Sequence, residues 1–142
     1  MEKLIRLSKS VIGPAEKSAV MAVMDHEYLG MGQEVQEFEN ALTDFFGRPA
    51  VCVNTGTSAL HLAVQALDLD PGSEVLVQSL TYVASFQAIS ATGAKPIPCE
   101  IDPDTITIDL EDAERRITDK TAAIMPIHYA SGVGKSEGTN NI

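Results

Sequence analysis

The chain has 142 residues, of which 44% are hydrophobic, and a net charge of −10, values that are typical of one globular domain. This acidic balance disfavours nucleic acid or an anionic membrane as a partner, so we expect neither. No apolar run reaches the length of a membrane span, and the first residues lack the apolar core of a signal peptide. The sequence therefore predicts a cytoplasmic protein.

The first third of the chain is predicted to be helical. Gly13 and Pro14 introduce a helix at residues 16–27. A second helix is predicted at residues 33–46, where apolar side chains recur at helical spacing, and Gly47 follows as its stop. We expect the apolar stripe of this second helix to lie in the core; it consists of Val35, Phe38, Leu42, Phe45 and Phe46.

Strands and helices are predicted to alternate from residue 50 onward. Short apolar runs between turn residues predict strands, and apolar residues at helical spacing predict helices. The prolines of residues 96–100 suit the edge of a sheet or the end of a strand better than a central position. The alternation predicts an α/β fold, a three-layer α/β/α sandwich with a mainly parallel sheet. The predicted strands are residues 50–53, 74–77, 96–100 and 121–127, and the predicted helices are residues 60–67, 82–92 and 110–117, the last capped by Asp109.

The turn at residues 54–60 is a candidate phosphate site. Glycine and hydroxyl residues lead here from a strand into a helix, whose first N–H groups and positive dipole end attract an anion. We expect the N–H groups of Thr57, Ser58 and Ala59 to point into an open pocket. An ordinary helix cap uses the same residue types, so the turn by itself leaves both interpretations open.

Tyr82 follows the next predicted strand. The carboxyl ends of parallel strands share one edge of a sheet, so we expect Tyr82 and Thr57 to flank the same cleft, with the tyrosine ring against a flat cofactor. Packing of the ring between helix and sheet is the alternative.

Several separated segments resemble one enzyme family. Residues 54–60, 79–85 and 126–132 are similar, in order and spacing, to segments of the DegT/StrS-type sugar aminotransferases, which depend on pyridoxal phosphate (PLP). Residues 28–35 also resemble the glycine loop near the family's N-terminus. The resemblance runs from about Leu7 to Gly134 and implies the fold type I of PLP enzymes.

The resemblance also implies a domain organisation and a set of ligands. Residues 1–134 would be the N-terminal part of the large domain, and residues 135–142 a divergent polar tail. Thr57 and Ser58 would bind the phosphate of PLP, and Tyr82 would stack on its pyridine ring. In the full-length family, an amino acid such as glutamate gives its amino group to a keto-sugar nucleotide, in amino-sugar or surface-polysaccharide biosynthesis. A homodimer is implied for the family but is not assumed for this chain.

The catalytic lysine of the family is not found in this sequence. PLP-dependent transamination needs a Schiff-base lysine and a carboxylate on the pyridinium nitrogen, and none of the lysines here lies in the family's lysine motif. We therefore assign no catalytic residue, interpret the chain as truncated or fragmentary, and expect weak, non-covalent PLP binding without transamination. A PLP-dependent sugar dehydratase and a non-catalytic remnant remain alternatives.

Histidine and cysteine are the other residue types that could contribute to a site. His128 lies in the family's Pro-x-His segment, where it either supports the site or only bonds to a loop. Cys52 and Cys99 fall in predicted strands without the spacing of a metal site, so we expect buried free thiols and no metal.

Overall fold

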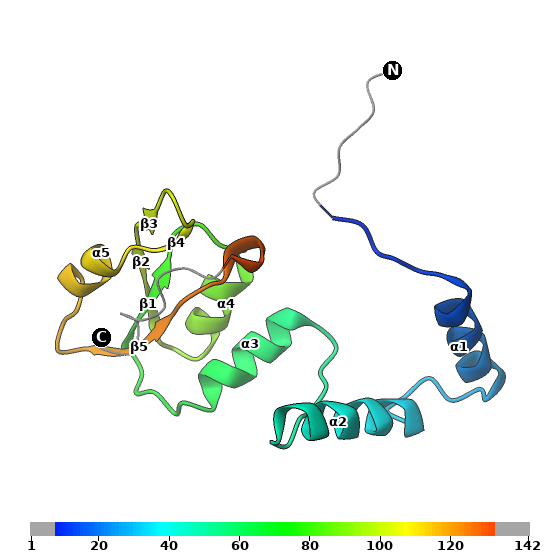
Figure 1. Ribbon diagram of the computed structural model, residues 1–142. Helices are drawn as coiled ribbons and strands as arrows, with labels where there is room; N and C mark the ends of the chain where they lie inside the picture. The colour runs from blue at the N-terminus through cyan, green and yellow to red at the C-terminus, as the bar shows by residue number, and fades with distance from the viewer. Residues whose placement is uncertain (1–7, 133–142) are drawn as a thin grey trace. The chain divides into compact units, whose positions relative to one another are not determined.

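The computed structural model describes residues 8–132. The chain divides into two compact units, residues 1–52 and 53–142, and each is described by itself (Figure 1). The predicted polar tail at residues 135–142 lies outside the described residues.

The first unit contains α1 (Pro14–Asp25) and α2 (Gln33–Phe46), which confirms both predicted helices. The N–H of Gly13 donates to the Glu16 carboxylate at 2.6 Å, which caps the start of α1. α2 ends at Gly47, whose φ of 64° is the left-handed conformation that glycine adopts without strain.

Within the first unit taken by itself, the apolar stripe of α2 is not buried, contrary to the expectation. Phe38, Phe45 and Phe46 are 57%, 81% and 67% exposed. An amphipathic helix buries its apolar face only against a second layer. Within the described residues of this unit the other element is α1, which has no buried residue and therefore supplies no such layer.

The second unit is built on a three-stranded parallel sheet with the order β2–β1–β5. The central strand β1 (Glu74–Gln78) lies between β2 (Lys95–Cys99) and β5 (Thr121–Met125). As expected, the proline-containing strand β2 lies at an edge of this sheet. The Lys95 N–H donates to the Ser73 carbonyl, on the β1 side of the strand. Because successive N–H groups of a strand point to opposite sides, the nitrogens of Pro96 and Pro98 face away from β1, where the sheet requires no donor.

Helices cover both faces of this sheet, as Figure 1 shows. On one face, Val75 and Val77 pack with residues of α3 (Gly56–Gln65) and α4 (Ala84–Ala91). On the other face, Leu76 packs with residues of α5 (Leu110–Arg115). Successive β1 side chains thus enter opposite layers, and the predicted three-layer α/β sandwich with a mainly parallel sheet is confirmed.

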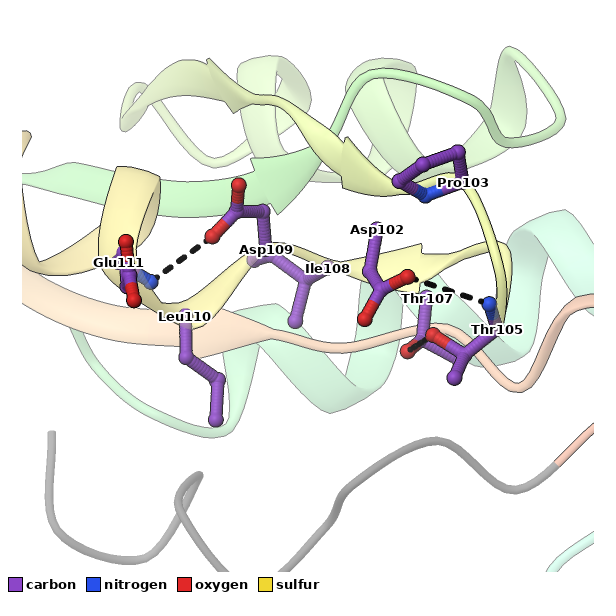
Figure 2. A pocket seen from close by; sticks show the side chains of 8 residues that line it. All are labelled: Asp102, Pro103, Thr105, Thr107, Ile108, Asp109, Leu110 and Glu111. Carbon is purple, nitrogen blue, oxygen red and sulfur yellow. Dashed lines mark hydrogen bonds between the residues drawn. The ribbon is translucent and has the colours of Figure 1, made fainter.

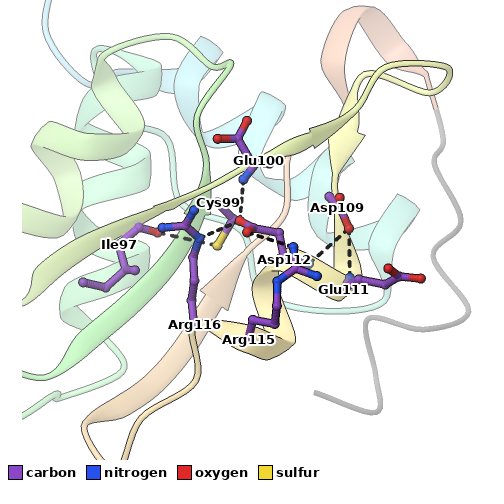
Figure 3. A network of polar contacts seen from close by, with 8 residues as sticks. All are labelled: Ile97, Cys99, Glu100, Asp109, Glu111, Asp112, Arg115 and Arg116. Atoms are coloured by element: carbon purple, nitrogen blue, oxygen red, sulfur yellow. Dashed lines mark hydrogen bonds and ion pairs between the residues drawn. The ribbon is translucent and has the colours of Figure 1, made fainter.

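A buried carboxylate fastens α5 to the sheet (Figure 3). Asp112 accepts a hydrogen bond from the Glu100 N–H at 2.8 Å and forms ion pairs with Arg115 and Arg116. The hydrogen bond from Arg116 and the one from the Glu100 backbone lower the pKa of Asp112 to about 2. On the sheet side of this network, burial and then the negative charge of Asp112 raise the pKa of the Cys99 thiol.

A small hairpin between β2 and α5 was not predicted. It pairs β3 (Ile101–Asp102) with β4 (Thr107–Ile108) in an antiparallel register. Strands of two residues are too short to produce a periodic signal in the sequence. The Asp102 carboxylate closes the turn between the two strands by accepting from the N–H groups of Asp104 and Thr105.

Residues 50–53, which were predicted as a strand, form no strand and pair with none of the described strands, so this prediction is wrong. Val51 is 78% exposed. The backbone donors here bond to side chains of α2 instead: the N–H of Cys52 donates to Glu39 at 2.7 Å, and that of Ala50 to Thr43 at 3.1 Å. Cys52 is consequently half-buried and outside any strand, whereas Cys99 is buried in β2 as expected.

Candidate functional site

The first turn of α3 carries the two predicted phosphate ligands, and Thr55 is its cap. The Thr55 hydroxyl accepts from the Ser58 N–H at 3.0 Å, and its carbonyl accepts from the Ala59 N–H at 3.1 Å. The Ser58 hydroxyl donates to the Asn54 side chain at 3.0 Å. The N–H groups of Ser58 and Ala59, which were expected to point into an open pocket, are instead both used by the cap.

Two other amides of this turn remain available. Among the described residues, no hydrogen bond is found for the N–H groups of Gly56 and Thr57, which are the first two residues of α3. Both residues are exposed, and a Cβ at Gly56 would meet no other atom within 4 Å. Two adjacent unpaired donors at the positive end of a helix dipole favour an anion. The candidate phosphate donors are thus shifted one residue toward the N-terminus.

Tyr82 lies in the loop that follows β1, two residues before α4 begins, and not inside the helix as predicted. Its side chain is 77% exposed, so the alternative of a ring packed between helix and sheet does not hold. Hydrogen bonds hold both ends of this loop. The Ser79 N–H donates to the Cys99 carbonyl at 2.8 Å, and the hydroxyls of Thr81 and Ser85 are 3.0 Å apart.

Tyr82 and Thr57 are placed by different kinds of contact. Tyr82 stands at the carboxyl edge of the sheet because it follows β1 directly. Thr57 is not placed by a strand of this sheet, because residues 50–53 do not pair. Its helix α3 instead packs beside α4 within the same unit. That both residues flank one cleft stays a prediction.

His128 follows β5, three residues beyond its last strand residue, and is exposed. It precedes the one-turn helix η1 (Tyr129–Ser131). Because β5 is parallel to β1 and adjacent to it, the segments that carry His128 and Tyr82 both leave the sheet at its carboxyl edge. Open α/β sheets bind ligands at this edge.

Gln78 is a residue that the sequence analysis missed. It ends β1, is completely buried, and donates to the Leu80 carbonyl in the Tyr82 loop at 2.8 Å. It also accepts from the Ile127 N–H, next to His128, at 3.2 Å. The available signal was a glutamine that directly follows three apolar strand residues.

A hollow of about 460 Å³ lies elsewhere in this unit, between the β3–β4 hairpin and α5 (Figure 2). Asp102, Asp109 and Glu111 contribute carboxylates to its lining, so it disfavours a phosphate. The described residues contain no group of three or more side chains that could hold a metal ion. In the same part of the chain, no helix is long and apolar enough to cross a membrane.

Comparison with known proteins identifies relatives over most of the chain. The model of the DegT/DnrJ/EryC1/StrS aminotransferase family matches residues 10–136. A dTDP-4-dehydro-2,3,6-trideoxy-D-glucose 4-aminotransferase from Saccharopolyspora spinosa is 36% identical over 135 residues, which are 93% of this chain and 35% of that protein. The chain thus spans about a third of the length of this relative.

Solved structures of sugar-modifying PLP enzymes are also similar to most of this chain. Spr1654, a candidate sugar aminotransferase from Streptococcus pneumoniae in its PMP form, has a TM-score of 0.87 and 32% identity; the match covers 97% of this chain and 35% of that one. An E. coli GDP-4-keto-6-deoxy-D-mannose-3-dehydratase with bound hydrated PLP has a TM-score of 0.86 and 26% identity; here the match covers 95% and 36%.

Proposed function

Because this chain belongs to the DegT/DnrJ/EryC1/StrS aminotransferase family, we propose that it forms the cofactor-phosphate and ring-binding part of a PLP-dependent nucleotide-sugar aminotransferase. The observation that carries the proposal is the N-terminus of α3. There the N–H groups of Gly56 and Thr57 have no hydrogen-bond partner within residues 8–132, while Thr55 caps the next two.

The residues of this turn fit a phosphate. The N–H groups of Gly56 and Thr57 donate to its oxygens, and the Thr57 hydroxyl adds a third donor. The Ser58 hydroxyl, which donates to Asn54, can rotate to the phosphate and exchange a neutral hydrogen bond for a charge-assisted one. The acidic net charge does not oppose this, because local amides and the helix dipole set the field at the turn.

Tyr82 fits the second part of the cofactor. Its exposed ring offers a flat apolar face to a pyridine ring, and stacked aromatic pairs are stabilising beyond the area they bury. When bound, PLP supplies the electron sink for amine transfer. The residues of this chain bind and orient the cofactor, and no lysine of the sequence is assigned the Schiff-base role.

The substrates are proposed for the whole protein. An amino acid such as glutamate gives the amino group, and a keto-sugar nucleotide accepts it, in amino-sugar or surface-polysaccharide biosynthesis. The name of the Saccharopolyspora spinosa relative supports this substrate class. The likeness to the E. coli dehydratase supports a second candidate, a PLP-dependent sugar dehydratase. Both candidates use the same phosphate turn, so one binding experiment tests the common part.

The experiment measures binding of pyridoxamine 5′-phosphate to the purified chain by calorimetry. This ligand carries an amine, so it cannot form Schiff bases with surface lysines. We expect weak, saturable binding that is inhibited competitively by inorganic phosphate. Pyridoxamine, which lacks the phosphate, should bind more weakly still. A hydrogen bond to a charged group contributes about 1.5 kcal/mol or more, so each lost donor weakens binding roughly tenfold.

Three variants locate the site. Thr57→Pro removes one N–H and one hydroxyl at a position where the first helical turn tolerates proline, and Tyr82→Leu removes the ring. Each should raise the Kd about tenfold or more. Tyr28→Leu changes an exposed tyrosine of the other unit and should leave the Kd unchanged. Equal binding of the phosphorylated and unphosphorylated ligands would contradict the proposal.

A further inference from the structure

Gln78 joins three segments of the second unit. It is 0% exposed at the end of the central strand β1. Its Nε2 donates to the carbonyls of Leu80 at 2.8 Å and Ile106 at 3.4 Å, and its Oε1 accepts from the Ile127 N–H at 3.2 Å. One side chain therefore bonds to the loop after β1, the turn of the β3–β4 hairpin and the segment after β5.

A buried amide of this kind holds its neighbours in place. An unsatisfied donor or acceptor in the interior bears its full desolvation cost, so the three segments cannot separate from Gln78 without a penalty. Ile106 shows the effect. Its φ of 57° is strained for a β-branched residue, and both of its backbone groups are bonded, the N–H to the Asp102 carbonyl and the carbonyl to Gln78.

Two of the three segments lead to residues of the candidate site. Leu80 is two residues before Tyr82, and Ile127 is adjacent to His128. The N-terminus of α3, in contrast, is held by its own cap at Thr55. The cofactor phosphate and the cofactor ring would thus be bound by parts of the unit that are stabilised independently.

We propose that Gln78 is a positioning residue that fixes the Tyr82 loop against the His128 segment at the carboxyl edge of the sheet. It acts through the Tyr82 loop on the ring of the ligand, and its three hydrogen bonds go to segments other than the phosphate turn. This inference rests on the proposed function and extends it by naming the side chain that holds the ring-binding loop.

The first test needs no ligand. Gln78→Met keeps the length of the side chain and removes all three hydrogen bonds, whereas Gln78→Glu keeps the acceptor for Ile127 and removes the donors. Hydrogen exchange should rise roughly tenfold or more in both variants at the hydrogen-bonded amides of the Tyr82 loop, those of Ser79 and Ser85. The Ile127 amide should lose protection in Gln78→Met and keep it in Gln78→Glu. Gln87→Glu, the same change at an exposed position of α4, is the matched control.

The second test is a double-mutant cycle on pyridoxamine 5′-phosphate binding. Gln78→Met should weaken binding about tenfold in the wild-type chain but much less in the Tyr82→Leu chain, because the ring it positions is already absent. In the Thr57→Pro chain its effect should remain about tenfold. A residue with only a general structural role would lower affinity by the same factor in all three backgrounds. If Gln78→Met does not fold, Gln78→Glu enters the same cycle.

The outcomes separate the two proposals. If the wild-type chain does not bind pyridoxamine 5′-phosphate, the proposed function fails. If it binds, and the effects of Gln78 and Tyr82 are independent, the positioning role alone is overturned. Unchanged exchange at the Ser79 and Ser85 amides of both Gln78 variants also overturns it, whatever the ligand result. Segment-specific exchange together with coupling to Tyr82 supports it.

Discussion

Leu76→Ala tests whether β1 is the shared centre of both layers. Leu76 is 0% exposed and packs against Cys99, Ile108 and Ala113 on the α5 side of the sheet. The substitution removes three carbon atoms, which corresponds to about 2.4 kcal/mol of lost burial at roughly 0.8 kcal/mol for each. The cavity left in a strand that is paired on both sides adds to this, so we expect a loss of about 3 kcal/mol in the free energy of unfolding.

The assay is urea unfolding followed by far-UV circular dichroism, because the sequence contains no tryptophan. With an m-value of about 1.5 kcal/mol per molar urea, the midpoint should fall by roughly 2 M. Leu62→Ala removes the same atoms from a side chain of α3 that is 50% exposed, and should cost less than about 1 kcal/mol. Equal midpoint shifts for the two variants would refute the assignment of Leu76 to the core.

Three further predictions follow from individual contacts. Because the pKa of Asp112 is lowered from 3.8 to about 2 in the folded chain, its ionised carboxylate stabilises the fold above pH 3.8, and this stabilisation is lost as the pH falls toward about 2. In Asp112→Asn, the urea midpoint should therefore decrease less steeply with falling pH over this range. Iodoacetamide should modify half-buried Cys52 in the native chain before buried Cys99, whose raised pKa also disfavours the reactive thiolate. Mass spectrometry of the peptides distinguishes the two sites, and equal modification rates would contradict the burial of Cys99 in β2. Thr55→Val should lower the stability of the second unit by about 1 kcal/mol in the same urea assay, whereas Thr55→Ser, which keeps the capping oxygen, should not.

Local signals in the sequence identified the α-helices of the described chain and several of their ends. The α2 boundaries and the Gly47 stop were predicted correctly, because a helix of 14 residues shows its apolar period several times and glycine marks its end. Asp109 was identified as the cap of α5 because its carboxylate reaches the N–H groups of Glu111 and Asp112, only two and three residues away. The edge position of β2 was also indicated locally, because proline itself lacks the backbone N–H that a central strand would need.

Tertiary structure decided everything that depends on a distant partner. Residues 50–53 have the composition of a buried strand but pair with no described strand, and the α2 aromatics have the spacing of a core stripe but remain exposed. The composition of a segment shows only that its side chains are apolar enough to be buried. The strand that would pair with it, or the layer that would cover it, is formed by residues distant in the sequence.

The candidate site divides in the same way. The sequence placed Thr57, Ser58 and Tyr82 near a helix start and a strand end, because those positions follow from local pattern. Which N–H groups of the turn remain unpaired depended on the geometry of the Thr55 cap. That Gln78 contacts Ile127, 49 residues away, depended on β5 lying beside β1. No local pattern contains that information, because hydrogen bonds between segments exist only once the sheet has brought the segments together.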